Sequence, residues 1–433
     1  MSGGFVPLSI LDLSPISAGS TAQQALRNTV DLAQHAEQWG YHRYWLAEHH
    51  FVSVASSSSI TLIGLVAAAT ERIRVGSAAV QVGHHTSASI VEAFGTIDAL
   101  YPGRLDLGLG RSGHRRGQFG AEAARPARGK TVVGTVTGRT EIRDGVVVPP
   151  PFDPGRILDR SKFIASVGAL QQRGAQPLEF AEQVGEVRAL LAGTFVSPEG
   201  VALHAVPGEG AQVRLWLFGS TAGESAELAG RLGLPFAAAY HVSPGTALDA
   251  IEAYRAAFRP SAELAEPYVV ISADVVVAED DATARRLAAS YGHWVHSIRS
   301  GAGAADYPDP ATIAPLTAEQ RRLVDDRLAT QFVGSPGAVV DRLSALQRVS
   351  GADELLVTTI THRHADRLQS HRLLAEAWGC ARPARPDAAP VGAPSSAPAG
   401  HRGRHSARRS GSNAPSGDER PPGTASKRPV PRA

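Results

Sequence analysis

The chain of 433 residues is poor in the side chains that build disulfides and cysteine-based metal centres. Cys380 is its one cysteine. An intrachain disulfide is therefore excluded, and so is any zinc or iron–sulfur site made of several cysteines. The single thiol lies where the composition of the chain changes, far from the motifs discussed below, so we do not expect it to act as a nucleophile.

Long apolar runs are also missing. The longest weakly polar stretch, residues 60–70, is too short to span a bilayer, and residues 1–15 lack the basic start and apolar centre of a secretory signal. Apolar residues nevertheless make up 43% of the chain and charged residues 19%, which suffices for a large core. We therefore expect a cytoplasmic protein with no membrane partner.

An excess of positive charge is confined to the end of the chain. The net charge is +2, but residues 381–433 hold ten basic and three acidic side chains, which leaves residues 1–380 at −5. This balance does not favour a nucleic-acid partner. Ten of the 29 prolines also follow residue 380. The composition predicts a disordered basic tail over 381–433 and one folded domain over 1–380.

Short apolar runs alternate with amphipathic segments through this domain. Strands are expected at 8–13, 41–47, 73–82, 104–110, 213–218, 235–240, 268–277 and 354–359. Helices are expected at 21–39, 60–70, 87–100, 177–191, 225–232, 246–258, 280–293, 336–349 and 365–378, with one more around 319–329. Eight strands that each lead into a helix predict an α/β fold, a closed (β/α)₈ barrel of the TIM type.

Two stretches do not fit the repeat. Residues 111–176, which include hairpin-like runs at 131–136 and 145–148, and residues 297–335 are read as insertions at the C-terminal mouth of the barrel. The loops that follow the strands of such a barrel form this mouth, where ligands bind. We therefore expect the functional residues at the ends of the strands.

The ends of the second to fifth strands carry polar motifs. They are Glu48-His49-His50, Gly83-His84-His85, Gly110-Arg111-Ser112 and Gly219-Ser220-Thr221. Adjacent histidines at a strand end point in opposite directions, so no metal site is expected. The pattern G-x-G-x-x-G at residues 108–113 lacks the helix that a dinucleotide site needs. Residues 219–221 precede a helix and can form either a phosphate site or an ordinary cap, and Arg111 can be a phosphate ligand or a surface residue.

Several segments together resemble the bacterial luciferase-like flavin monooxygenase family. They are LSILDLSP, ALRNTVDLAQHAEQWGYHRYWLAEHHF, AAATERIRVGSAAV, AFGTIDALYPGRLDLGLGR and RLWLFGSTAGESAELAGRLGLPFAAAYH, in the family's order. The resemblance implies a (β/α)₈ barrel that binds reduced FMN at its mouth and uses O₂ to oxygenate a small organic substrate. It also implies a separate flavin reductase as partner and a homodimer.

The resemblance also assigns roles to individual residues. His49 matches a catalytic histidine at the reactive face of the flavin, which stabilises or proton-couples the oxygenated cofactor, and its neighbour His50 is expected to contact the cofactor. The pair Ala78-Ala79 matches a non-proline cis peptide against the flavin ring. Phosphate contacts are implied for Arg111, Gly219, Ser220 and Thr221. Two alternatives stay open: a deazaflavin-dependent oxidoreductase on the same barrel, and a non-catalytic flavin-binding protein.

Overall fold

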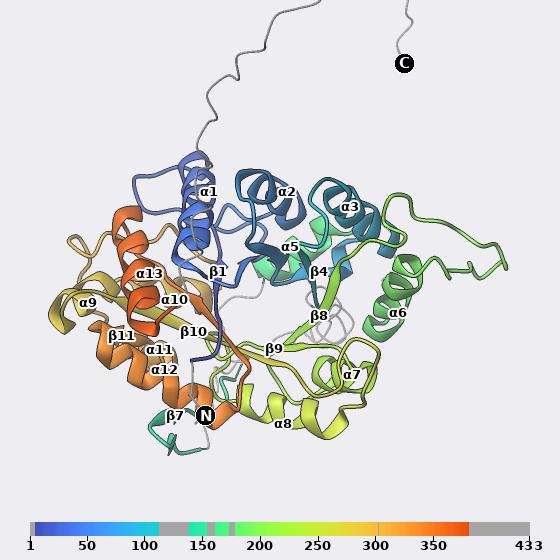
Figure 1. Ribbon diagram of the computed structural model, residues 1–433. Helices are drawn as coiled ribbons and strands as arrows, with labels where there is room; N and C mark the ends of the chain where they lie inside the picture. The colour runs from blue at the N-terminus through green and yellow to red at the C-terminus, as the bar shows by residue number, and fades with distance from the viewer. Residues whose placement is uncertain (1–4, 112–137, 154–160, 173–177, 302, 381–433) are drawn as a thin grey trace, which may run out of the picture. The chain divides into compact units, whose positions relative to one another are not determined.

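A computed structural model describes residues 5–111, 138–153, 161–172, 178–301 and 303–380. The predicted hairpin strand at 131–136 and the predicted tail at 381–433 lie outside these residues. Within them, strands form the centre and helices surround them (Figure 1).

Parallel strands close into a barrel with eight positions, as the sequence predicts. The ring runs from β1 through β2, β3, β5, β8, β9, β10 and β12 back to β1, and every pairing in it is parallel. The short strand β4 continues β3 and pairs with β5. The strands of the ring are β1 (Leu8–Asp12), β2 (Arg43–Leu46), β3 (Arg74–Ser77), β4 (Val80–Gln81), β5 (Leu105–Gly110), β8 (Arg214–Gly219), β9 (Phe236–Ala238), β10 (Val269–Val277) and β12 (Glu354–Thr358).

Helices connect the strands and cover the barrel from outside (Figure 1). The first begins after Thr21, whose side chain accepts a hydrogen bond from the Gln24 amide, and ends at Gly40 in the left-handed conformation. The helices are α1 (Ala22–Trp39), α2 (Ser59–Ala69), the 3₁₀ turn η1 (Val82–His84), α3 (Ser87–Leu100), α5 (Ser161–Leu170), α6 (Phe180–Leu191), α7 (Glu224–Leu232), α8 (Ala247–Ala257), α9 (Asp281–Ala288), α10 (Tyr291–Arg299), α11 (Ala318–Ala329), α12 (Pro336–Ser350) and α13 (His364–Trp378).

Four details differ from the sequence-based expectation. The helix expected at 280–293 is interrupted after Ala288, and α10 starts anew at Tyr291 because the Tyr291 and Trp294 side chains turn into a buried cluster. The insertion at 297–335 ends in a strand, β11 (Phe332–Gly334), which extends the edge of β10. The other insertion contains two unpredicted elements, the helix α5 and the strand β6 (Glu141–Arg143), and β6 pairs with β7 (Val146–Val148) in the hairpin expected at 145–148.

A buried ionic layer fills the N-terminal end of the barrel. The Arg43 guanidinium lies 3.1 Å from Asp106 and also contacts Glu354, and all three side chains are almost fully buried. Trp45 and Trp216 form the next layer, with ring centroids 5.3 Å apart and nearly perpendicular planes. These layers fill the lower part of the barrel, so ligand chemistry belongs at the opposite, C-terminal end.

Candidate functional site

The C-terminal ends of neighbouring strands bring the residues predicted from the sequence to one mouth. His49 follows β2, Ala78 and Ala79 separate β3 from β4, and Arg111 follows β5. Gly219 is the last residue of β8, and Ser220 and Thr221 lead into α7. Since β2, β3, β5 and β8 are consecutive in the ring, these residues lie along one side of the mouth.

The peptide bond between Ala78 and Ala79 is cis, as the resemblance implies. Neighbouring glycines allow the backbone to approach here. A Cβ atom on Gly110 would lie 3.1 Å from the Ala79 Cβ, and one on Gly108 would lie 2.0 Å from the Ser77 carbonyl oxygen. Only glycine fits position 108, because real Cβ atoms do not come that close to a carbonyl oxygen.

Arg111 lies beside the predicted phosphate turn. Its Nη1 donates to Oε2 of Glu224, the first residue of α7, over 2.5 Å, and both side chains are about one-third exposed or less. The adjacent turn is held by Thr246, whose hydroxyl donates to the Ser220 carbonyl oxygen. A guanidinium and the free amides of a helix start are thereby combined at one place, which is the arrangement that binds phosphate groups.

Glu48 forms a buried polar network behind His49. Its Oε1 lies 3.1 Å from His50 Nε2 and 3.3 Å from His85 Nε2, and its Oε2 accepts from the Ser59 hydroxyl. Burial opposes the charge of this carboxylate, but the hydrogen bonds from His50, His85 and Ser59 outweigh burial and lower the pKa of Glu48 to about 2. Because the carboxylate is ionised and only accepts, both imidazoles carry their proton on Nε2.

His49 lies next to this network at the mouth. Solvent reaches part of the His49 side chain, but the protein groups around the ring reduce the hydration of its charged form. This loss of hydration and the nearby His50 lower the pKa of His49 below its usual 6.5, so its imidazole is neutral at neutral pH. A neutral imidazole can both accept and donate a proton, which suits general acid–base work.

His241, which follows β9, contacts strand β10, and β10 also carries part of a second polar group. Its Nδ1 lies 2.5 Å from the Ser272 hydroxyl of β10, and burial together with the charges of Arg327 and His49 lowers the pKa of His241 to about 3.

Buried side chains from β10, α10 and α11 form this second group. The Arg327 Nη2 donates to the Tyr291 hydroxyl over 2.6 Å and lies 3.3 Å from Asp274 Oδ2, and the Tyr291 hydroxyl donates to the same carboxylate. Burial raises the pKa of Asp274, and Arg327 and Tyr291 only partly offset it. Trp294 and Tyr307 pack against the group, with ring centroids 6.4 Å apart.

Sequence reasoning did not identify this second group. Asp274, Tyr291, Trp294, Tyr307 and Arg327 come from four segments that no motif connects. The sequence offered no direct signal, because Tyr291 and Trp294 lie on α10, Arg327 lies on α11, and Tyr307 lies in the loop between these helices. His85 was noted only as part of the polar motif after the third predicted strand, and its contact with Glu48 emerges from the structure.

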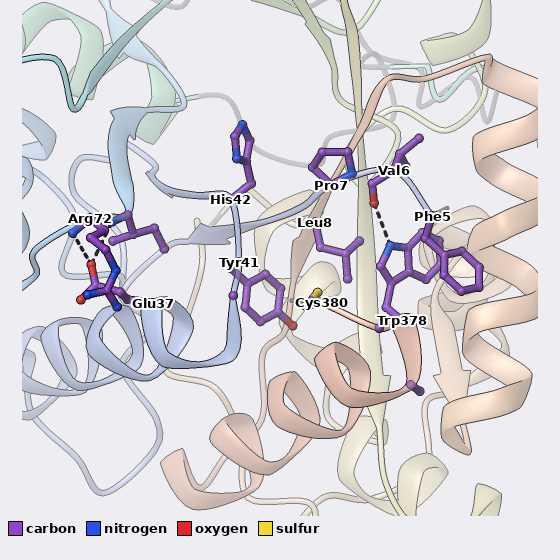
Figure 2. A pocket seen from close by; sticks show the side chains of 14 residues that line it. Phe5, Val6, Pro7, Leu8, Glu37, Tyr41, His42, Arg72, Trp378 and Cys380 are labelled. Atoms are coloured by element: carbon purple, nitrogen blue, oxygen red, sulfur yellow. Dashed lines mark hydrogen bonds between the residues drawn. The ribbon is translucent and has the colours of Figure 1, made fainter. Parts of the chain in front are cut away.

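A cavity at the N-terminal end of the barrel is unrelated to this mouth. It measures about 680 Å³ and is bounded by the starts of β1 and β2 and by the end of α13 (Figure 2). The Trp378 indole donates to the Val6 carbonyl oxygen on one side of it. Cys380 lies there too, and burial raises the pKa of its thiol to about 11, which makes it a poor nucleophile.

The described part of the chain contains no group of three or more His, Cys, Asp or Glu side chains arranged to hold a metal ion. No helix there has the length and apolar character needed to cross a membrane.

Comparisons with known proteins agree with the geometry. The family model described as luciferase-like monooxygenase matches residues 6–130 and 172–354. The uncharacterized protein YvbT of Bacillus subtilis (strain 168) is 36% identical over 86% of this chain and 96% of its own length. A luciferase-like monooxygenase of Escherichia coli (strain K12) is 32% identical over 85% of this chain and 96% of its own length.

Solved structures share the fold. Apo-MsnO8 superposes with a TM-score of 0.67 at 29% identity, covering 87% of this chain and all of that one. The oxygenating constituent of 3,6-diketocamphane monooxygenase, in complex with FMN, gives 0.53 at 17% identity over 86% and 97% of the two chains. An F420-dependent secondary alcohol dehydrogenase gives 0.52 at 13% identity over 86% and 99%. The last two similarities show the barrel fold alone.

Proposed function

The chain belongs to the luciferase-like monooxygenase family, and on this premise we propose that it is a monooxygenase that uses reduced FMN and O₂ to oxygenate a small organic substrate. One observation supports a cofactor of the flavin type. The mouth combines a phosphate-binding arrangement at Arg111 and α7 with a flat backbone surface at Ala78-Ala79 on the adjacent strand. A flavin mononucleotide has a phosphate at one end and a planar ring at the other.

The residues fit each part of FMN. The amides of the turn at Gly219, Ser220 and Thr221 and the guanidinium of Arg111 would hold the phosphate, and Glu224 would have to release Arg111. The ring would lie against Ala78-Ala79, where Gly108 and Gly110 keep side chains away. The bound, reduced flavin supplies the electrons that activate O₂.

His49 is the proposed catalytic residue. A neutral imidazole at the mouth can hold or transfer the proton that the reaction of a reduced flavin with oxygen requires. His50 is proposed to contact the cofactor. The Glu48 carboxylate fixes the His50 ring and its tautomer, because its Oε1 accepts from His50 Nε2.

Partners follow from the same proposal. A separate flavin reductase would supply reduced FMN, and the active protein would be a cytoplasmic homodimer. The purified protein should then oxidise NADH or NADPH only when a flavin reductase is added. Rapid NADH oxidation with FMN alone would contradict the proposed partner.

Anaerobic titration tests the cofactor. Photoreduced FMN should bind in the micromolar range or tighter, and reduced F420 should bind at least tenfold more weakly, with binding followed by the absorption of each cofactor. The reverse order would favour a deazaflavin-dependent oxidoreductase. Tight FMN binding without any effect on its oxidation would favour a flavin-binding protein without catalysis.

A further inference from the structure

Three buried hydrogen-bond donors beneath the mouth have no acceptor among the described residues. They are Nε1 of Trp294, the hydroxyl of Tyr307 and Nε of Arg327. These side chains are 5%, 0% and 7% exposed. Buried donors are normally paired, so three neighbouring donors without an acceptor indicate a place where the acceptor atoms of a ligand can bind. We call Trp294, Tyr307 and Arg327 the donor cluster.

The donor cluster belongs to one connected group. The rings of Trp294 and Tyr307 are 6.4 Å apart, and those of Tyr291 and Trp294 are 6.2 Å apart. The Arg327 guanidinium carbon lies 5.6 Å from the centre of the Tyr291 ring. The three donors therefore belong to neighbouring side chains of one buried group.

Backbone contacts fix the cluster to the mouth. The Tyr307 amide donates to the Ile16 carbonyl oxygen after β1, and the Tyr307 carbonyl oxygen accepts from the Ala18 amide. The Ser53 amide, which follows His49 and His50, donates to the Ala304 carbonyl oxygen. The segment that carries Tyr307 is thus bound to the loops after β1 and β2, and the second of these loops also carries His49.

The charges of the group favour an anion. Arg327 is permanently charged, and Asp274 is the carboxylate that faces it. Of the Arg327 nitrogens, only Nη2 reaches Asp274, so Nε on the other edge of the guanidinium is left without an acceptor among the described residues. His241, in the loop after the neighbouring strand β9, is neutral at physiological pH, and Arg299 is already paired with Asp326 through two hydrogen bonds. A carboxylate provides both the negative charge and the acceptor atoms that these donors lack.

The surroundings define the rest of the ligand. Leu13 and Val54 belong to the same buried cluster as Trp294 and Tyr307, and so does the partly buried Ala78. Apolar side chains therefore pack around the donor cluster as far as Ala78. An apolar chain or ring is the part of a ligand that such surfaces retain.

We propose that the donor cluster binds the carboxylate of the substrate, so that the enzyme oxygenates monocarboxylic acids whose apolar part lies toward Ala78. The assignment of this ligand as the substrate rests on the proposed monooxygenase function. The binding site itself does not, since a carboxylate can be tested on the protein without flavin.

Isothermal titration of the flavin-free protein with hexanoate and with hexanamide tests the proposal. The two probes have the same length and differ in charge and in acceptor atoms. Hexanoate should bind at least about tenfold more tightly, because hydrogen bonds to a charged group exceed those to a neutral one. Equal affinities, or no binding of hexanoate at millimolar concentration, would overturn the proposal.

Tyr307→Phe sharpens the test, because it removes one donor and keeps the ring. It should weaken hexanoate binding about three- to tenfold, leave hexanamide binding nearly unchanged and leave the melting temperature unchanged or higher. Tyr254→Phe is the matched control, since the Tyr254 hydroxyl is paired with the Leu234 carbonyl oxygen and the Tyr268 amide. This control should lower the melting temperature and leave hexanoate binding unchanged.

Two outcomes separate this proposal from the flavin assignment. A Tyr307→Phe protein that binds hexanoate like the wild type would exclude Tyr307 from the site, whatever its flavin affinity. A lower melting temperature of Tyr307→Phe, with hexanoate binding unaltered, would show that the hydroxyl has a structural partner and would overturn its role as a ligand donor. Reduced FMN is titrated in parallel, so failure to bind flavin is recorded separately.

Discussion

Nη1 of Arg111 lies 2.5 Å from Oε2 of Glu224, although 113 residues separate them in the chain. The contact joins the end of β5 to the first turn of α7, so a basic side chain stands beside a helix start whose amides are free. On the proposed function, a bound FMN phosphate would replace Glu224 as the anionic partner of Arg111.

Arg111→Ala should weaken the binding of reduced FMN about 10- to 100-fold, the effect of losing a charge-assisted hydrogen bond of roughly 1.5–3 kcal/mol. Riboflavin, which lacks the phosphate, should bind the variant and the wild type equally. Arg231→Ala is a suitable control, because Arg231 forms an exposed pair with Glu227 on the same helix. An equal loss for both flavins would argue against a phosphate contact.

Glu224→Gln should act in the opposite direction. The variant removes the carboxylate that competes with the phosphate, so reduced FMN should bind about two- to fivefold more tightly at low salt, and less so at high salt. Anaerobic titration at two salt concentrations measures the effect. Weaker binding of FMN would show that Glu224 orients Arg111 for the phosphate.

Glu48→Gln should destabilise the protein by up to about 3 kcal/mol near neutral pH, because the pKa of Glu48 falls from 4.5 to about 2 on folding. A lowered pKa stabilises the fold above the unfolded value of 4.5, and this contribution disappears as the pH falls toward 2. The difference in unfolding free energy between variant and wild type should thus be constant above about pH 5 and half lost near about pH 3.

Urea unfolding at several pH values measures this difference. Glu227→Gln is the control, because its exposed pair with Arg231 should contribute less than about 1 kcal/mol at any pH. A difference for Glu48→Gln that does not change with pH would contradict an ionised carboxylate in the network.

Cys380 should react slowly with thiol reagents. Raising its pKa from 9.0 to about 11 lowers the thiolate fraction at pH 8 about 100-fold, and the thiolate is the reactive form. Since it is the only cysteine, mass spectrometry after iodoacetamide treatment reports on this one site. The protein unfolded in urea should be alkylated at the normal rate, and equal rates in both states would contradict the burial of the thiol.

The barrel and one side of its mouth could be predicted from the sequence. The strands are short and apolar and alternate with helices, so the polar residues at their ends, Glu48-His49-His50, Arg111 and Ser220, could be assigned to one end of the fold. The donor cluster could not, because Trp294, Tyr307 and Arg327 meet only after the insertion following β10 folds back over the mouth. The break between α9 and α10 was missed for the same reason: the buried position of Tyr291 decides it, and helix periodicity does not reveal this.

The reaction of the flavin-loaded protein with oxygen tests the central claim most directly. Protein saturated with photoreduced FMN is mixed with oxygenated buffer, and flavin oxidation is followed by absorption, for the wild type, for His49→Ala and for His42→Ala, a histidine at the opposite end of the barrel. The account predicts that FMN bound to the wild type and FMN bound to His42→Ala are oxidised with the same time course, which differs from that of free FMN. In His49→Ala, the proton-coupled step of flavin oxidation should be about 10²-fold slower at similar flavin affinity. Identical traces for His49→Ala and the wild type, or oxidation at the rate of free FMN in all three, would contradict it.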